Sequence, residues 1–191
     1  MTSKEKVKNN SLLTTLINVK SSELFWIITF SVLTALSAQV AVPTQPVPFT
    51  LQTMLVLLSG AFLGSSKSAY SQILYLAVGV IGLPVFAGFT FGFAKLFGPT
   101  GGYLLSFPFA AFLVGYILEG KTNSFLILLS FIAGQLLILL AGASYLSVFM
   151  GGDFSKALFS GVIIFSVWDI IKIAAAFSIY KAVSLKYPKL P

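Results

Sequence analysis

Asp169 and Lys172 are the residues of this chain best placed to bind a polar solute, because they interrupt an otherwise uncharged apolar segment, residues 157–180. A segment of that length can cross a membrane, where a charge costs about 2.5–3.5 kcal/mol on insertion scales. Positions three apart share one face of a helix, so the two side chains can pair with each other and with a ligand. A purely structural ion pair is the alternative, and we favour the solute site.

The composition is that of a membrane protein. The chain is 57% hydrophobic and only 9% charged, with a mean hydropathy of +0.97, whereas soluble domains carry about 25% charged residues. We therefore expect residues 1–191 to form a single membrane domain. The chain contains neither Cys nor His, which excludes disulfides, imidazole catalysis and the usual zinc sites. We expect no cofactor, no metal and no enzymatic activity.

Charges and prolines divide the sequence into six predicted transmembrane helices, which makes the expected fold an all-α membrane protein. The second helix would have about 15 residues and span ~22 Å, which is short for a hydrocarbon core of about 30 Å. Irregular backbone is tolerated at membrane depth where it lines a cavity, so we expect a site beside this helix. The predicted helices are residues 23–42, 50–64, 68–82, 101–118, 123–149 and 154–184.

The twelve lysines set the orientation. With the N-terminus in the cytoplasm, Lys95 and Lys156 face the outside and Lys172 lies in the membrane, while the other nine face the cytoplasm. Residues 1–22 and 185–191 would then be cytoplasmic segments of a multi-pass protein in a bacterial plasma membrane. Since the lysines are dispersed, we expect no nucleic-acid partner. The cytoplasmic lysines are Lys4, Lys6, Lys8, Lys20, Lys67, Lys121, Lys181, Lys186 and Lys189.

Two irregular segments carry further candidate residues. Residues 43–52 contain three prolines that favour an extended backbone, and they end in Phe49, Thr50 and Gln52. Residues 83–100, between the third and fourth helices, form a connection that is long for a helical bundle. We predict that this loop is a re-entrant segment or a lid that closes over the solute.

A match to the phosphate-binding P-loop pattern G-x-x-x-x-G-K-[ST] occurs at residues 115–122. A true P-loop follows a buried strand and opens a helix, so that free backbone N–H groups surround the phosphates. Here the match closes an apolar helix. We interpret it as a helix stop signal and not as a nucleotide site.

Three ordered motifs resemble those of the BioY family, and together they span nearly the whole membrane region. They are VPFTLQT with LLSGAFLG at residues 47–53 and 57–64, GLPVFAG with GPTGGY at residues 82–88 and 98–103, and DIIKIAA at residues 169–175. In the family a Pro-Gly pair usually precedes the aspartate. Because FSVW at residues 165–168 replaces it here, we expect the last helix to run unbroken.

The resemblance implies a biotin-specific substrate-binding subunit of an energy-coupling factor transporter. The ureido N–H groups of biotin would meet Asp169, and the ureido carbonyl would meet Lys172 or Gln52. Apolar walls and contacts to the valerate carboxylate would come from the remaining candidates of the three motifs and their neighbours. These are Phe49, Thr50, Phe86, Gly88, Gly98, Gly101, Tyr103 and Trp168.

The resemblance also implies partners. Such subunits dock on a membrane scaffold subunit, and two cytoplasmic ATPases drive release of the solute to the inside. Small residues four apart on the first helix allow close contact between helices. Ser31, Ala35 and Ala38 are therefore the expected docking residues.

Three alternatives remain open at the level of sequence. The chain could bind another vitamin such as thiamine or riboflavin. It could be a small intramembrane enzyme that uses Asp169, Lys172 and Tyr103. It could also be a structural membrane subunit without a ligand.

Overall fold

The computed structural model describes residues 22–121, 123–163 and 166–185. This part of the chain forms seven α-helices, and helix boundaries agree with the predicted ones to within a few residues except at the last helix. The predicted segments 1–22 and 185–191 lie almost entirely outside the described residues. The helices are α2 (Glu23–Gln39), α3 (Gln52–Leu63), α4 (Ser65–Ile81), α5 (Gly101–Leu118), α6 (Ser124–Phe149), α7 (Phe154–Gly161) and α8 (Ser166–Ser184).

Glycines let the central helices approach closely. A Cβ atom built on Gly134 of α6 would lie 2.6 Å from Cγ2 of Val114 on α5 and 2.7 Å from Cδ2 of Leu57 on α3. A Cβ atom on Gly60 of α3 would lie 2.6 Å from the carbonyl oxygen of Ala111 on α5. Small residues at such crossings bring helix backbones together in membranes. The three helices therefore form a tight unit against which the other helices pack.

The prediction of one unbroken last helix is wrong. The chain ends α7 at Gly161 and begins α8 at Ser166, and the two helix axes differ by 50°. The break is stabilised by side chains: the hydroxyl of Tyr103 donates to the carbonyl of Gly161 (3.0 Å), and the hydroxyl of Ser166 donates to the carbonyl of Ile163 (2.8 Å). These bonds satisfy carbonyls that the interrupted helix leaves without a helical partner. The break places Asp169 in the first turn of α8.

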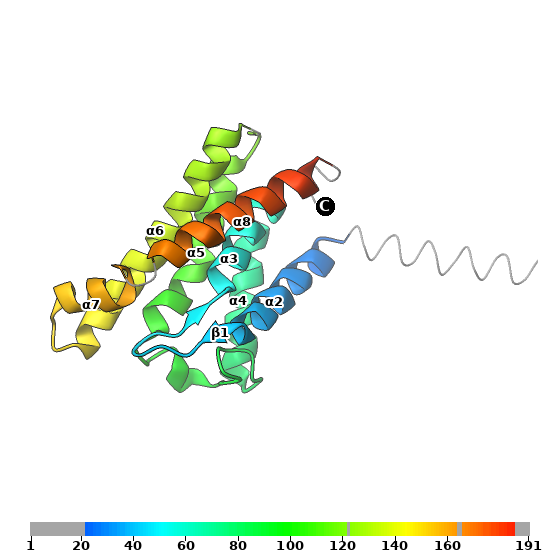
Figure 1. Cartoon of the computed structure of the whole chain (residues 1–191). Coiled ribbons are helices and arrows are strands. Elements are labelled where there is room, and N and C mark those ends of the chain that lie inside the picture. The colour runs from blue at the N-terminus through cyan, green and yellow to red at the C-terminus, as the bar shows by residue number, and fades with distance from the viewer. Residues whose placement is uncertain (1–21, 122, 164–165, 186–191) are drawn as a thin grey trace, which may run out of the picture.

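A short hairpin and a long loop lie together at one end of the bundle, as Figure 1 shows. Strands β1 (Ala41–Val42) and β2 (Phe49–Thr50) pair antiparallel, and the loop of residues 83–100 contains a single 3-10 turn, Phe93–Lys95. Gln39, at the end of α2, holds the loop: its Nε2 donates to the carbonyl of Phe86 (3.1 Å), and its Oε1 accepts from the backbone N–H of Phe89 (3.0 Å). The end of α2 and the loop thus form one structural unit.

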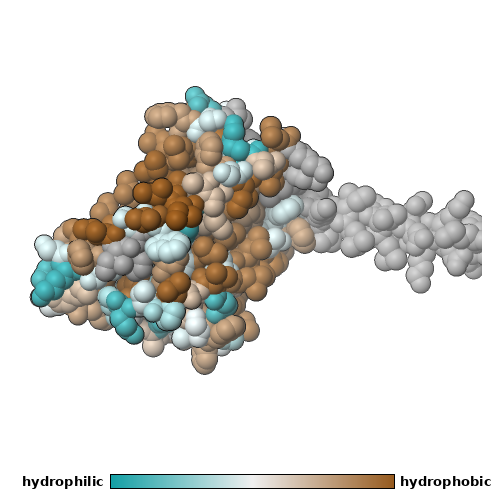
Figure 2. Space-filling view, viewed as in Figure 1, coloured by the Kyte–Doolittle hydropathy of each residue, from teal (hydrophilic) through white to brown (hydrophobic). Residues whose placement is uncertain are grey.

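The surface matches a helical membrane protein. Figure 2 shows apolar residues over the flanks of the bundle and polar residues mainly toward its ends. By length and composition α5 and α6 are each able to cross a membrane, and α7 with α8 adds a third span if the bent pair is counted as one. The apolar helices α2 and α3 are shorter, with 17 and 12 residues. The predicted all-helical membrane architecture is confirmed at this level.

Candidate functional site

A polar cavity of about 70 Å³ lies beneath the hairpin, between the loop and helices α3, α5, α6 and α8. Residues far apart in the sequence meet here because the hairpin and the loop close over the same end of the bundle (Figure 1). Apolar walls are interrupted by a small set of polar side chains, which is the usual design of a small-molecule site. The polar residues that line it are Thr50, Gln52, Thr53, Lys95, Thr100, Tyr103, Gln135, Asp169 and Lys172.

Asp169 and Lys172 form a buried ion pair at this cavity. Lys172 Nζ lies 2.6 Å from Asp169 Oδ1, and the two residues are only 6% and 4% exposed. The position of Asp169 in the first turn of α8 places its carboxylate near the positive end of the helix dipole. Within the described residues, Asp169 Oδ2 has no hydrogen-bond partner. One carboxylate oxygen is therefore held by the lysine, and the other is available to a donor in the cavity.

Lys172 directs its ammonium group at protein oxygens. Besides Asp169 Oδ1, its Nζ donates to Oγ1 of Thr53 (2.8 Å) and to the carbonyl of Thr50 (3.4 Å). An ammonium group has three N–H donors, so these three oxygens use all of them. The ring of Phe49 lies 4.8 Å from the same nitrogen, within the range of a cation–π interaction. Lys172 consequently fixes Asp169 and ties α8 to the hairpin and to α3.

Gln52 belongs to a buried hydrogen-bond chain that spans four elements. The hydroxyl of Thr50 donates to Gln52 Oε1 (3.1 Å), and Gln52 Nε2 donates to the hydroxyl of Tyr75. That hydroxyl in turn donates to the carbonyl of Val85 (3.4 Å). The chain joins the hairpin, α3, α4 and the loop, so the predicted site residues Thr50 and Gln52 lie at the cavity and also shape it.

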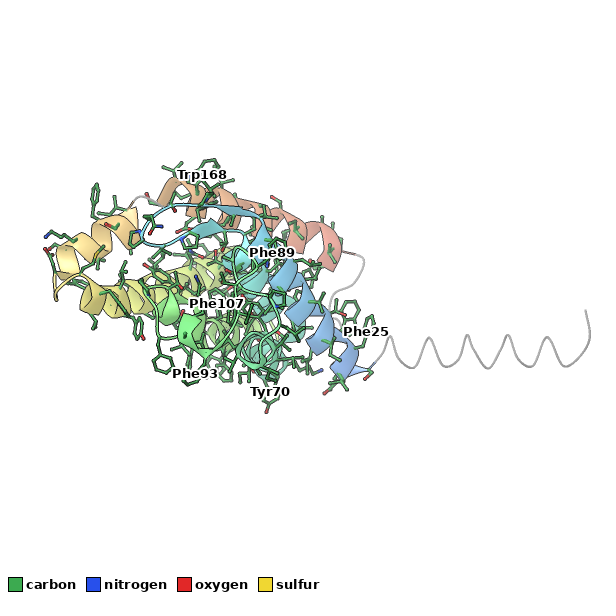
Figure 3. All side chains as sticks on the ribbon, turned by 90° about the horizontal axis from the view of Figure 1, so that it is seen from below. Phe25, Tyr70, Phe89, Phe93, Phe107 and Trp168 are labelled. Carbon is green, nitrogen blue, oxygen red and sulfur yellow. The ribbon has the colours of Figure 1, made fainter. Side chains whose placement is uncertain are left out.

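Aromatic rings form the apolar wall. Phe86 is fully buried and packs edge-on against Tyr75, with ring centroids 5.6 Å apart. It occupies space that a side chain at Gly79 would need. Phe49 and Phe107 line the same cavity, and Figure 3 shows Phe107 in the interior of the bundle. These rings offer a flat apolar surface to a solute.

Trp168 lies outside the cavity, contrary to the expected flat wall. Its side chain is 54% exposed and lies at the edge of the molecule, on the outer side of α8 (Figure 3). Its ring centroid is 5.4 Å from that of Phe49, so it supports this wall residue from behind. In the first turn of α8, which begins at Ser166 after the helix break, Asp169 points inward and Trp168 points outward.

The residues expected to contact the carboxylate of the ligand lie in two places, the cavity and a neighbouring groove. Tyr103 lines the cavity, but its hydroxyl already donates to Gly161. The backbone N–H of Gly101 donates to the carbonyl of Gly98 (2.8 Å), and Gly101 packs against the backbone of the preceding turn. Gly88 and Gly98 border a second, open groove of about 610 Å³ between the hairpin and the loop.

Lys95 is a site residue that the sequence arguments missed. It lines both the cavity and the open groove, and it is half-buried where the two meet. Its position in an irregular loop gave no periodic signal, and we assigned it only to the outer face. Among the described residues, Lys95 is the lysine that lines both the cavity and the groove.

Gln135 is the second missed residue. It lies in the middle of α6, is 3% exposed and lines the cavity. A single amide in an apolar helix is usually a hydrogen-bonding contact between helices, so its sequence context indicated nothing more. The signal that identifies it is structural, because it lines the same cavity as Asp169.

The P-loop-like match lies at the end of α5. Gly115 packs against the backbone of Gly64 and Ser65, where a Cβ atom would not fit. Glu119, two residues before Lys121, accepts a hydrogen bond from the backbone N–H of Ser65 (3.4 Å). Gly115 therefore serves helix packing. Helix α5 ends at Leu118, as expected for a helix stop.

A bundle of apolar helices that encloses a polar cavity under a hairpin and a loop defines a membrane protein that holds a small solute. Comparison with known proteins specifies the class further. A sequence model described as the BioY family matches residues 7–189, and the chain belongs to this family.

Its relatives cover most of the chain. A protein of Pyrococcus horikoshii named "Probable biotin transporter BioY" is 41% identical over 83% of this chain and 93% of that one. A "Biotin transporter BioY" of Thermotoga maritima is 38% identical over 77% and 86%. The fold matches a crystal structure of "the S-component for biotin from an ECF-type ABC transporter" with a TM-score of 0.79 and 27% identity, covering 96% of this chain and 94% of that one.

Proposed function

We propose that this chain is the biotin-binding S component of an energy-coupling factor transporter. The observation that carries the proposal is the free oxygen of Asp169 in a polar cavity with aromatic walls. Biotin offers N–H donors on a cyclic urea at one end, an apolar ring and chain in the middle, and a carboxylate at the other end. The family membership and the printed names of the relatives support the same solute.

The cavity suggests one orientation of the vitamin. The urea lies at Asp169, because a carboxylate oxygen accepts N–H donors strongly. The fused ring and the valeryl chain lie along Phe49, Phe86 and Phe107. The carboxylate lies toward Lys95, where the cavity opens into the groove. Lys172 positions Asp169 in this arrangement and leaves the ligand contact to the carboxylate.

The topology that we propose has six spans with both termini in the cytoplasm. The seven described helices give six spans if α7 and α8 form one bent span and each of α2, α3, α4, α5 and α6 crosses the membrane once. The hairpin and the 83–100 loop then face outside, where Lys95 lies, while Lys67 and Lys121 face the cytoplasm. We infer that the loop is the lid of the site.

The scaffold subunit would dock on α2. Ser31 and Ala35 border an apolar groove between α2 and α4, together with Leu24 and Ile28. Ala38, which we also expected to contact the scaffold, is fully buried in the structure. Ser31 is also buried, at 6% exposure, so the proposed docking surface centres on Ala35, which is partly exposed. Two cytoplasmic ATPases that act through the scaffold would drive release of the solute into the cell.

An uptake assay tests the function. The chain is expressed in biotin-requiring bacterial cells that lack their own biotin transporter, with and without a scaffold subunit and ATPases of a matching transporter. We expect accumulation of labelled biotin that is abolished by Asp169→Ala and raised by the scaffold and ATPases. Cells whose biotin uptake equals that of the empty vector under every combination would contradict the proposal.

A further inference from the structure

Gln135 lines the cavity and carries two buried polar atoms that the described part of the protein does not use. Neither its Nε2 nor its Oε1 has a hydrogen-bond partner in the part of the chain that the structure describes. The side chain is nevertheless 97% removed from solvent, given its 3% exposure. A buried polar group without a partner costs about 1–3 kcal/mol, and native structures contain few of them. A structural role in helix contact does not explain this amide, because it bonds to no other helix among the residues that the structure describes.

The backbone beside Gln135 packs closely against neighbouring helices. The preceding residue, Gly134, packs directly against Val114 and Leu57 with no room for a side chain. One turn further along α6, Ile138 is fully buried and lines the same cavity. The amide therefore extends from a closely packed part of α6 and belongs to the cavity lining that also includes Asp169.

Lys172 and Gln52, which also line the cavity, already use their polar groups. Lys172 directs its three protons at Asp169, Thr53 and Thr50. Gln52 accepts from Thr50 and donates to Tyr75. Among the described cavity residues, the buried polar atoms left without a partner are Asp169 Oδ2 and the two amide atoms of Gln135. They amount to two acceptors and one N–H₂ donor group.

We propose that Gln135 is the residue that makes the site specific for a cyclic urea. This inference rests on the proposed function. The amide edge of Gln135 is complementary to one edge of a urea: its Nε2 donates to the urea carbonyl while its Oε1 accepts one urea N–H. Asp169 Oδ2 accepts the second N–H. Each polar group of the ring then has one partner, and each free polar atom of the site is satisfied.

The same geometry rejects a cyclic guanidinium. In 2-iminobiotin the carbonyl oxygen is replaced by an N–H₂ group, so the ring has only donors. The amide of Gln135 always directs one donor at this ring, whichever way its oxygen and nitrogen are placed. A site built to hydrogen-bond a particular group discriminates strongly against an analogue that leaves its polar atoms unpaired.

The test is the ratio of the dissociation constants of 2-iminobiotin and biotin in the full-length purified chain. Gln135→Glu replaces the N–H₂ donor of the amide by a second acceptor oxygen. We expect weaker biotin binding, stronger 2-iminobiotin binding and a fall in the ratio of about 100-fold or more. Gln135→Leu, of similar size, should weaken biotin and desthiobiotin, which share the urea, by the same factor of roughly 10 to 100.

Gln72 offers a matched control. It is a fully buried amide on α4 that also has an unpartnered oxygen, but it contacts Thr34, Ser59 and Ser71 away from the cavity. Gln72→Leu should leave the ratio unchanged, and thermal unfolding of each variant without ligand reports its fold. If wild-type protein binds biotin but both Gln135 variants keep its affinity and ratio, Gln135 has no specificity role. If folded wild-type protein does not bind biotin at all, the proposed function itself fails.

Discussion

Replacing Asp169 by Asn removes the negative charge of the side chain while nearly preserving its shape. The Asn side chain keeps an acceptor oxygen for Lys172, which lies 2.6 Å from Asp169 Oδ1, but it loses the negative charge of the free oxygen. Hydrogen bonds to charged groups contribute about 1.5–3 kcal/mol, and every 1.4 kcal/mol is about tenfold in affinity. We therefore expect biotin to bind roughly 10- to 150-fold more weakly to Asp169→Asn.

The same substitution should lower stability. Removing one partner of a buried ion pair costs about 3–5 kcal/mol, because the other charge stays buried. Since Lys172 keeps its bonds to Thr53 and Thr50, we expect a loss near the lower end of this range. The double variant Asp169→Asn with Lys172→Met removes both charges. It should regain stability relative to Asp169→Asn without regaining affinity.

Isothermal titration with biotin in detergent, beside thermal unfolding of the same samples, separates the two effects. Asp153→Asn is the matched control, because Asp153 is a partly exposed carboxylate that pairs with Lys156 at 3.3 Å outside the cavity. It should bind biotin like the wild type. Wild-type affinity in folded Asp169→Asn would refute the assignment of Asp169 as the urea acceptor.

Three further predictions concern the elements around the site. Gln39→Leu removes three hydrogen bonds to the loop and should speed biotin dissociation about tenfold, measured by ligand exchange; an unchanged rate would contradict the lid. Gly60→Ala places a Cβ atom 2.6 Å from the carbonyl of Ala111 and should destabilise the protein by about 1–3 kcal/mol. Gly98→Ala meets its nearest atom at 3.6 Å and is the control, so equal unfolding midpoints for both variants would argue against tight packing of α3 and α5. The backbone N–H of Lys156 holds the pKa of Asp153 below its usual value. Because the folded pKa is depressed, this stabilisation is present above the unfolded pKa and is lost as the pH falls through the folded pKa. Asp153→Asn should remove that acid-range dependence from the unfolding midpoint, and an unchanged profile would contradict it.

The sequence predicts helices well where their ends are marked by local signals. Helix α5 begins and ends at the predicted residues, since two glycines follow Pro99 at its start and Glu119 and Lys121 follow its end. The break between α7 and α8 could not be predicted in the same way. The hydroxyl that stabilises it comes from Tyr103, on a different helix. The local hydrogen bond from Ser166 to Ile163 is thus joined by a tertiary contact that the local sequence does not show.

The candidate site likewise contains some residues that the sequence predicts and others that only the structure reveals. Asp169 and Gln52 are identifiable because charges and amides are conspicuous within apolar segments, and the structure does bring them to one cavity. The outward direction of Trp168 depends on the helix break and so escaped prediction. The role of Gln135 depends on which polar atoms remain unpaired after folding, and that inventory exists only in the three-dimensional structure.

Equilibrium titration of the purified chain with biotin, thiamine and riboflavin tests the central claim most directly. The account predicts saturable binding of biotin alone, with a marked loss of affinity in Asp169→Ala and a wild-type response in the Asp153→Asn control. Equal binding of the three vitamins, or biotin binding that is indifferent to Asp169, would contradict a biotin site built on this carboxylate.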